Sequence, residues 1–326
     1  MHKNYVILAH RNQNQLDRLI RILCDGESKF FVHIDKNRPI EEFKDLRHMK
    51  NVRLVEPAVR CAWGDFSLVQ TTLNCIRQVL LSGHVGHTIL LSGQDYPIVS
   101  NAYINRFLEE NINIDFIERT PIHIKWPNDF KQRTEYYRFT LSKNRGDYVR
   151  IPYIGSKQFY NPLLLFSVVK KLIKVRPPLP EIYAIAKAVS KPRAKPRIDL
   201  VGGTQWFALT HPTITKISRY CQEHPEYLEF HKHTHVPDEI FFGSIVNAIM
   251  KDDASIATKP CITYANWSKN SSGPEVLTKS NIQDLATAAE SGNILFARKF
   301  DIDICDAILD MIDVKLRADH GVLGFS

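Results

Sequence analysis

The chain has 326 residues, of which 44% are hydrophobic and 24% charged, with 14 glycines and 17 prolines. This length suffices for one large α/β domain or two smaller ones, and the composition excludes a collagen, a coiled coil and a largely disordered chain. The net charge of +8 lies in one segment, because residues 161–197 hold nine basic residues and one acid while the rest balances to zero. No nucleic-acid-binding motif accompanies this charge, so a surface that coats nucleic acid is not indicated.

The start of the chain and its cysteines bear on the cellular compartment. The first ten residues show no charged-then-apolar leader, and no apolar run approaches the roughly 18 residues that a membrane helix needs. The six cysteines lie far apart with no Cys-x-x-Cys pair, which favours reduced thiols over a zinc ribbon or a disulfide framework. We therefore expect a cytoplasmic protein.

The first 120 residues predict an alternation of strands and helices. Strands are expected at 5–9, 30–35, 52–55, 88–91 and 115–118, and helices at 16–23 and 67–81. Such alternation predicts an α/β fold with a mainly parallel central sheet flanked by helices. Because ligands bind beyond the carboxyl ends of such strands, we expect His10, Asp35 and Asp95, which each close a strand, to converge on one cleft.

The expected cleft lacks the usual phosphate-binding loops. The residues after the first strand, Ala9-His10-Arg11-Asn12-Gln13, contain neither the Gly-x-Gly-x-x-Gly pattern nor a P-loop, so a phosphate-bearing ligand would need another cationic partner. Asp35 follows the first strand by about 25 residues, a spacing at which an acid often binds ribose hydroxyls. A turn or capping role is the alternative for Asp35.

The alternation fails between residues 141 and 197. Helices are expected at 163–175 and 182–189, with prolines between them and a Pro/Lys/Arg-rich stretch after the second. One interpretation is a mobile insertion with a solvated basic face. The other is a surface that rests on anionic lipid or holds an acidic acceptor, because clustered Lys and Arg beside apolar residues suit interfacial binding.

Regular elements resume after this insertion. A strand is expected at 202–210 and a helix at 212–221. A further helix is expected to begin at Val236-Pro237-Asp238-Glu239, because proline and acids are typical of a helix N-terminus.

Seven motifs of this chain occur in an order that resembles one family. The motifs are the strand and helix at 5–23, Val32-His33-Ile34-Asp35, Trp63-Gly64-Asp65-Phe66-Ser67, Leu91-Ser92-Gly93-Gln94-Asp95-Tyr96-Pro97-Ile98, Gly203-Thr204-Gln205-Trp206-Phe207-Ala208-Leu209, Pro237-Asp238-Glu239 and Leu295-Phe296-Ala297-Arg298-Lys299-Phe300-Asp301. The set resembles the core-2/I-branching glycosyltransferases, which include β-1,6-N-acetylglucosaminyltransferases and peptide xylosyltransferases. The resemblance covers residues 4–140 and 198–317 and leaves out the basic insertion.

The resemblance implies a GT-A fold and one catalytic domain over residues 1–326. We expect a nucleotide-sugar-binding half at 1–140, a basic helical insertion at 141–197 and an acceptor and catalytic half at 198–326. The implied reaction is a metal-independent, inverting transfer of a sugar, foremost N-acetylglucosamine, from a UDP-sugar to a hydroxyl of a glycan. The alternatives are transfer of xylose or another hexose, and a non-catalytic carbohydrate-binding relative.

The resemblance also assigns chemistry to three residues. Glu239 of the Pro-Asp-Glu motif is expected to be the general base, since inverting transfer needs one carboxylate to take the acceptor proton; the alternative is a helix N-terminus that merely favours acids. Lys299 matches a family position that contacts the diphosphate, and Arg298 is expected to assist it or to be a solvated neighbour. The family uses a second basic residue about twenty positions earlier, where this chain offers only Lys279.

Donor and acceptor contacts complete the expected site. His10, Asp35 and Asp95 are the candidates for contacts to uridine, ribose and the sugar. Glu118, Arg133 and, less closely matched, Lys131 resemble acceptor contacts of the family, and Trp267 matches an aromatic position that stacks on a sugar, with core packing as the alternative.

No metal or other cofactor is expected beside the UDP-sugar co-substrate. The family works without the metal that most GT-A enzymes hold through an Asp-x-Asp motif, and Asp301-Ile302-Asp303 follows the cationic pair instead of ending the central strand. Alternating His231, His233 and His235 are expected in a polar loop and not at a metal. A bacterial-type enzyme of surface polysaccharide synthesis, acting on a lipid-linked glycan with peripheral contact to the inner face of the membrane through 161–197, would reconcile these features.

Overall fold

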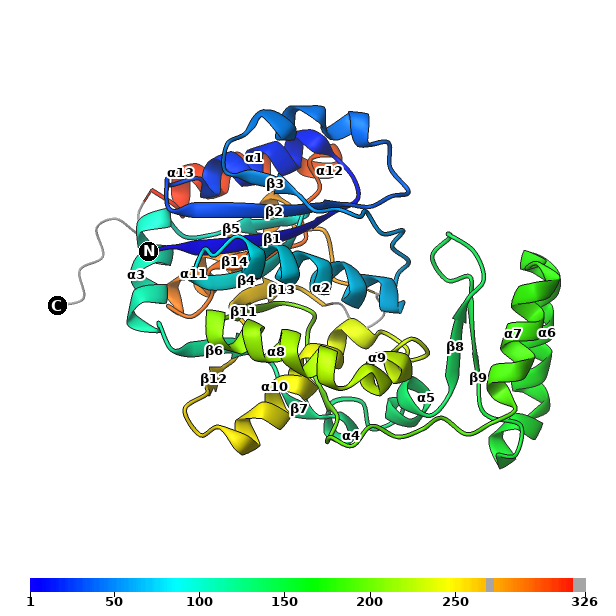
Figure 1. The fold of residues 1–326 in the computed structure, drawn as a ribbon. Helices are drawn as coiled ribbons and strands as arrows, with labels where there is room; N and C mark the ends of the chain where they lie inside the picture. The colour runs from blue at the N-terminus through cyan, green and yellow to red at the C-terminus, as the bar shows by residue number, and fades with distance from the viewer. Residues whose placement is uncertain (268–272, 319–326) are drawn as a thin grey trace.

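The computed structural model describes residues 1–267 and 273–318, with a sheet at the centre of the main body (Figure 1). Within these residues the central sheet has seven strands in the order β12, β6, β11, β4, β1, β2 and β3. They span Lys3–Ala9 (β1), Ser28–Ile34 (β2), Val52–Leu54 (β3), His87–Ser92 (β4), Ile114–Ile117 (β6), Phe207–Leu209 (β11) and Ala257–Lys259 (β12). Neighbouring strands are parallel except at β11, which runs antiparallel to β4 and β6.

The sheet is buried on both faces, as a parallel sheet in an α/β fold requires. Alternate residues of β1 point to opposite sides: Tyr5 and Ile7 belong to one core cluster, while Val6 and Leu8 belong to the other. The expected α/β fold with a mainly parallel sheet flanked by helices is therefore confirmed, and it is the GT-A-like arrangement that the resemblance implied.

Two groups of helices supply these clusters. The first cluster is covered by α1 (Gln13–Leu23), α3 (Asn101–Glu110), α11 (Ile282–Glu290), α13 (Ala307–Lys315) and the 3-10 helix η1 (Ile40–His48). The second is covered by α2 (Phe66–Leu81), α8 (His211–Glu223), α9 (Pro225–His231) and α10 (Phe241–Asp252). Figure 1 shows α1 and α13 on one side of the sheet and α2, α8 and α10 on the other.

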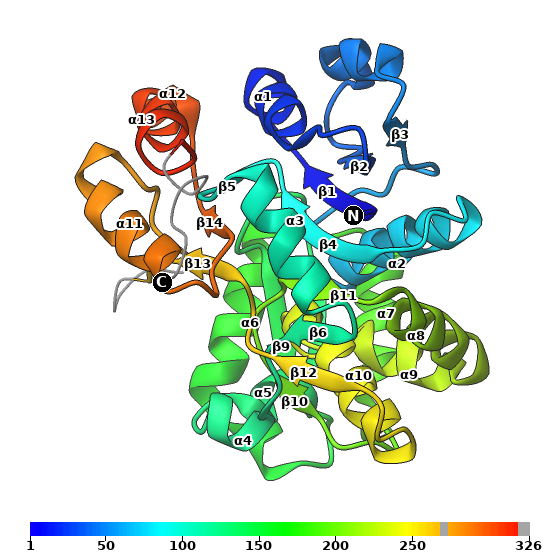
Figure 2. The same cartoon turned by 90° about the vertical axis from the view of Figure 1, so that its left-hand side faces the viewer.

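A smaller sheet lies beside the main one. It has the order β13 (Thr263–Ala265), β14 (Phe296–Arg298) and β5 (Asp95–Pro97), and α11, α12 (Ile302–Cys305) and α13 gather near it (Figure 2). No strand was predicted at Asp95–Pro97, which directly follow the strand expected at 88–91. Pairing with β14 extends this short segment, an interaction between residues about 200 positions apart that local sequence does not reveal.

The strand predicted at 202–210 is divided in two. Val201–Gly202 forms β10 and pairs with β7 (Thr120–Pro121), whereas β11 joins the central sheet. The loop between them, residues 203–206, therefore leaves one sheet and enters another. Pro237–Glu239 also differs from expectation, because it forms a separate 3-10 helix, η3, ahead of α10.

The segment around the basic insertion projects from the main body (Figure 1). It contains the two-stranded ribbon β8 (Tyr137–Thr140) and β9 (Tyr148–Ile151), which the sequence did not predict, followed by η2 (Lys157–Tyr160), α6 (Pro162–Val175) and α7 (Leu179–Val189). The remaining elements lie outside the stretch from β8 to α7. They are the short helices α4 (Ile122–Lys125), α5 (Phe130–Thr134) and η4 (Lys279–Asn281). A third hydrophobic cluster joins the ribbon to the inner faces of α6 and α7.

None of the helices in the described residues has the length and apolar character needed to cross a bilayer.

Candidate active site

A cavity of about 240 Å³ lies where β1, β2 and β4 end. It is lined by Leu8, Ala9, His10, His33, Asp35, Cys61, Ala62, Trp63, Leu68, Ser92, Gln205, Trp206 and Arg298. The structure thus brings His10, Asp35 and Arg298 together from three distant parts of the chain. Asp35 accepts hydrogen bonds from the backbone N–H groups of Asn37 and Cys61, so part of its role is to hold the loops that form the wall.

Asp95 is placed differently from the other predicted donor residues. It is fully buried and does not line the cavity. Its carboxylate accepts bonds from the Ser92 backbone N–H at 2.6 Å and from Nε of Arg298 at 2.9 Å. Burial raises the pKa of this carboxyl group, and the charge of Arg298 opposes that shift. Asp95 therefore positions Arg298 instead of reaching a ligand.

Strand pairing explains how Arg298 is aimed. Arg298 lies directly opposite Asp95 in the antiparallel pair of β14 and β5, where side chains of facing residues meet. Its guanidinium carbon also lies 4.1 Å from the centre of the Trp206 ring. One carboxylate and one aromatic face thus fix this cation at the edge of the cavity.

Three basic side chains lie near one another at the edge of the cavity, and we call them the cationic group. They are Arg298, Lys299 and Arg145. Burial lowers the pKa of Lys299, and the charges of Arg145 and Arg298 lower it further. In the described residues no side-chain hydrogen bond or ion pair joins Lys299 to an acid. Like charges held close together are unfavourable unless an anion is shared, so this group is suited to bind a diphosphate.

Arg145 is a member that sequence reasoning missed. It sits in the turn between β8 and β9, and its guanidinium carbon lies 4.7 Å from the ring centre of Trp63, which lines the cavity. Lys279, which the sequence offered as a second cation, is exposed and is not among the groups that shift the pKa of Lys299. The fold supplies a second cation from the ribbon instead.

A second set of charged side chains lies near Gly203, at the start of loop 203–206. It consists of Glu239, Arg133, Glu118 and Lys125, and we call these four residues together the carboxylate group. Nη1 of Arg133 donates to Oε2 of Glu239 at 3.0 Å, and Lys125 forms an ion pair with Glu118. The Arg133 guanidinium also stacks at 3.9 Å over the ring of Trp126. Glu118 and Arg133, predicted as acceptor contacts, therefore adjoin the predicted base.

Loop 203–206 ties the two groups together. The backbone N–H of Gly203 donates to the carbonyl of Glu239 at 2.9 Å, and a Cβ at Gly203 would meet the Glu118 carbonyl oxygen at 2.5 Å, so only glycine fits there. Three residues later, Trp206 lies under Arg298. Three trans peptide units span at most roughly 11 Å, so the two backbone positions that these groups contact lie close together, while neither Glu239 nor Glu118 lines the cavity at the strand ends.

The pKa of Glu239 is raised by burial, while the charge of Arg133 opposes the shift. A raised pKa makes this carboxylate a stronger base than an exposed one. The adjacent Asp238 is buried, and its pKa is also raised by burial and by the charge of Glu239. The charge of Glu239 therefore disfavours ionisation of the neighbouring Asp238.

The remaining predicted acceptor residues are peripheral. Lys131 is exposed, with its ammonium nitrogen 5.9 Å from the ring of Phe130, and the lysine that pairs with Glu118 is Lys125. Trp267 is 54% exposed, which excludes the core-packing alternative and leaves its ring open to a ligand.

The two patterns considered for metals have other contacts. Arg11 bonds to both Asp301 and Asp303. His231 is buried and ends α9 instead of lying in the expected polar loop, whereas His235 lies in the loop after α9 but is buried against the rings of Trp63 and Tyr148. Among the described residues there is no cluster of three metal-ligating side chains.

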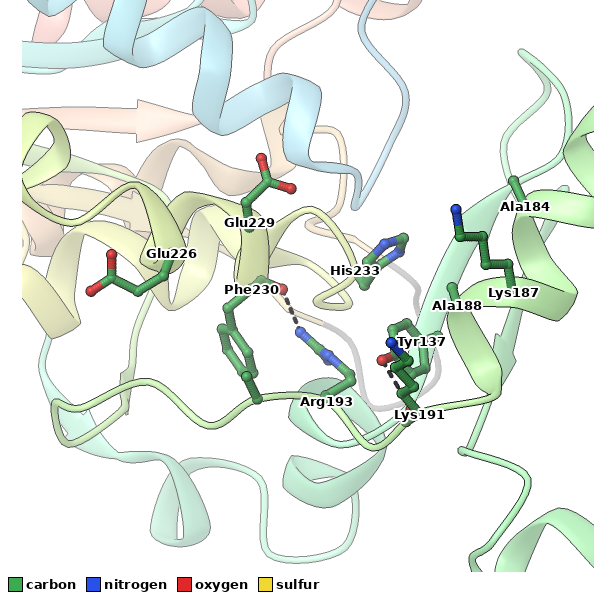
Figure 3. Close-up of a pocket in the computed structure, with 11 residues that line it drawn as sticks. Tyr137, Ala184, Lys187, Ala188, Lys191, Arg193, Glu226, Glu229, Phe230 and His233 are labelled. Atoms are coloured by element: carbon green, nitrogen blue, oxygen red, sulfur yellow. Dashed lines mark hydrogen bonds between the residues drawn. The ribbon is translucent and has the colours of Figure 1, made fainter.

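A larger cavity of about 580 Å³ lies at the joint between α7 and α9 and contains none of the predicted residues (Figure 3). Arg193 lies within it and donates to the carbonyl oxygens of Tyr136 and Phe230. Burial lowers the pKa of this guanidinium to about 9. These bonds anchor the end of α7 to the main body.

Comparisons with known proteins agree with the earlier resemblance. Residues 4–144 match the sequence model of a family described as Core-2/I-Branching enzyme. A xylosyltransferase of Ciona intestinalis is 21% identical over 334 residues, covering 97% of this chain and 34% of that protein. Beta-1,3-galactosyl-O-glycosyl-glycoprotein beta-1,6-N-acetylglucosaminyltransferase 3 of Homo sapiens is 31% identical over 104 residues, 30% of this chain and 24% of that protein. The chain thus spans about a third or less of the length of these two curated relatives.

Proposed function

We propose, because residues 4–144 match the sequence model of the Core-2/I-Branching enzyme family, that the chain is a glycosyltransferase that moves a sugar from a UDP-sugar to a hydroxyl of a glycan acceptor. The reaction is a single displacement with inversion: the acceptor oxygen attacks the anomeric carbon while UDP departs from the opposite face. Such a step needs one base and one means of holding the charge that develops on the leaving group.

The observation that carries this proposal is the arrangement of the two charged groups. Glu239, which pairs with Arg133, meets loop 203–206 at Gly203, and Arg298 of the cationic group meets the same loop at Trp206. In this proposal the two ends of one short loop supply a proton acceptor and an anion site, and inverting transfer requires each.

The cavity at the strand ends receives the nucleotide in this proposal. His10 and Asp35 contact the uridine and ribose, and Trp63 and Trp206 provide aromatic walls. The diphosphate then extends toward Lys299, where Arg298 and Arg145 share its charge. Fixed cations stabilise a departing diphosphate without reorganising, so the reaction is proposed to proceed without a divalent metal.

Glu239 accepts the proton of the acceptor hydroxyl. Arg133 holds its carboxylate at 3.0 Å and favours its ionised form. The ion pair of Glu118 and Lys125 and the exposed ring of Trp267 are available to bind the acceptor glycan.

The donor sugar has two candidates. N-acetylglucosamine is the first, as in the name of the human relative, and xylose is the second, because the relative whose match covers nearly the whole chain is named a xylosyltransferase. The two sugars differ in an acetamido and a hydroxymethyl group, which pocket shape discriminates.

A nucleotide-sugar screen tests the proposal. A ligand that binds the native state raises the melting temperature, so UDP and either UDP-N-acetylglucosamine or UDP-xylose are expected to stabilise the protein in EDTA, while GDP- and CMP-sugars do not. Donor turnover in EDTA should follow the same preference. Absence of any UDP-dependent shift would overturn the proposed function.

A further inference from the structure

The outer faces of α6 and α7 carry a concentration of exposed apolar side chains. Of the seventeen large hydrophobic residues that are exposed among those described, eight lie between residues 160 and 183. They are Tyr160, Leu163, Phe166, Val169, Ile173, Leu179, Ile182 and Tyr183. Exposed patches of this kind mark interaction surfaces, because a solvated helix face normally carries polar residues.

Packing of the two helices does not account for this face. Their inner sides supply Val168, Leu172, Ile185 and Val189 to the cluster with the β8–β9 ribbon. The outward residues Leu163, Phe166 and Ile173, which are 79%, 70% and 66% exposed, follow the spacing of one helical face. Each helix therefore has one apolar side that is used internally and a second that is open.

Positive charge surrounds the open face. Lys170, Lys174 and Arg176 are exposed on or just after α6, and residues 161–197 carry the entire net charge of the chain. A second copy docked on this face about a two-fold axis would place the same cations opposite one another. An anionic surface, in contrast, satisfies the apolar side chains and the cations together.

We propose that the outer face of α6 and α7 binds the surface of a bilayer that contains anionic phospholipid, with the apolar side chains in the interfacial region and the lysines at the head groups. This mode needs an apolar strip flanked by Lys and Arg, and it does not need a helix long enough to span the membrane.

The placement of this face has a consequence for the candidate active site. The parallel strands β1, β2 and β4, whose ends form the cavity, run toward the side on which the ribbon and α6 and α7 lie (Figure 1). The ribbon carries Arg145 to the cavity and also packs on α6 and α7. Binding through α6 and α7 would thus hold the cavity near the membrane surface, where an acceptor joined to a lipid is accessible.

Vesicle sedimentation tests the proposal with two pairs of variants. The full chain is expected to bind vesicles of phosphatidylglycerol and phosphatidylcholine, and to bind vesicles of phosphatidylcholine alone far more weakly. Phe166→Ser with Ile173→Ser should weaken binding about tenfold or more. Lys170→Gln with Lys174→Gln should weaken it roughly thirtyfold at low salt, and raised salt should reduce wild-type binding as well.

Matched controls separate this surface from general stickiness. Leu81→Ser with Val85→Ser removes two apolar side chains that are also exposed, and Lys44→Gln with Lys50→Gln removes two exposed lysines elsewhere; both are expected to bind vesicles like wild type. Sedimentation needs no turnover, and a UDP-induced thermal shift in the same samples reports whether each variant is folded. Equal binding by all variants, no binding to anionic vesicles, or a wild-type dimer that the Phe166 and Ile173 changes convert to monomer without vesicle binding would each overturn the proposal.

Discussion

The two charged groups at loop 203–206 differ in how their charges are balanced. In the carboxylate group, Glu239 has Arg133 and Glu118 has Lys125, so each acid has an opposite charge at hydrogen-bonding distance. In the cationic group, Arg298 is paired with Asp95, whereas burial and the charges of Arg145 and Arg298 lower the pKa of Lys299 more than the nearby Asp301 raises it. The first group is balanced before any ligand arrives, whereas the second favours an arriving anion. The difference assigns proton transfer to one and binding of the leaving group to the other.

The largest effect on turnover is expected at Glu239, the proposed base in the carboxylate group. Glu239→Gln removes the proton acceptor but preserves the shape of the side chain, so turnover should fall by about a thousandfold, within the usual contribution of a general base. UDP affinity, measured by calorimetry, should change little. Turnover within a few-fold of wild type would reassign the base, and the neighbouring acid Asp238 would then be the residue to examine.

Replacing Lys299, which forms no ion pair with an acid in the described residues, should affect both UDP binding and turnover. Lys299→Ala is expected to lower turnover by about a hundredfold, since loss of one preorganised group that stabilises developing charge costs about this much or more. Its affinity for UDP should fall, while its affinity for uridine stays close to wild type. Lys279→Ala is the control, because Lys279 is exposed and lies outside the cationic group.

A change at Arg145 tests whether the β8–β9 ribbon contributes to the UDP-binding site. Arg145→Gln should weaken UDP binding about tenfold, the usual worth of one charge-assisted hydrogen bond, and Arg145→Lys should recover part of the loss. Lys143→Gln changes an exposed cation in the same turn and should have little effect. Equal UDP affinity for Arg145→Gln and wild type would remove Arg145 from the site.

The smallest expected effect is a shift in pH dependence. Glu239 must be ionised to act, so kcat/KM should fall as the pH drops through its pKa, which burial places above the ordinary value of 4.5. Arg133 lowers that pKa, so Arg133→Gln should move the acid limb upward by about one pH unit. Lys131→Gln, a change at an exposed neighbour, should leave the limb in place. An unchanged limb in Arg133→Gln would mean that another group sets the acid limb.

Sequence patterns located the residues that close strands. His10 and Asp35 meet at one cavity because parallel strands present their carboxyl ends at the same edge, and Arg298 joins them from β14 of the smaller sheet. The Trp63-Gly64-Asp65 motif is explained by local structure, since Asp65 caps α2 and also binds Arg138 of β8.

The residues that sequence reasoning missed come from long-range packing. Lys125 reaches Glu118 from a single-turn helix, and Arg145 reaches Trp63 from the tip of a ribbon whose strands were not recognised. Asp95 was predicted to close a strand, but it is the first residue of β5, and pairing of β5 with β14 brings its buried carboxylate to Arg298. No periodicity in the sequence reports which hairpin tip folds over which strand end.

The most direct test of the central claim is calorimetric titration of UDP into wild-type protein and Lys299→Ala, with EDTA or with Mn²⁺. If fixed cations hold the diphosphate, wild type binds UDP equally well under both conditions, and Lys299→Ala loses affinity for UDP but not for uridine. Binding that requires Mn²⁺, together with equal UDP affinities of the two proteins, would contradict the account.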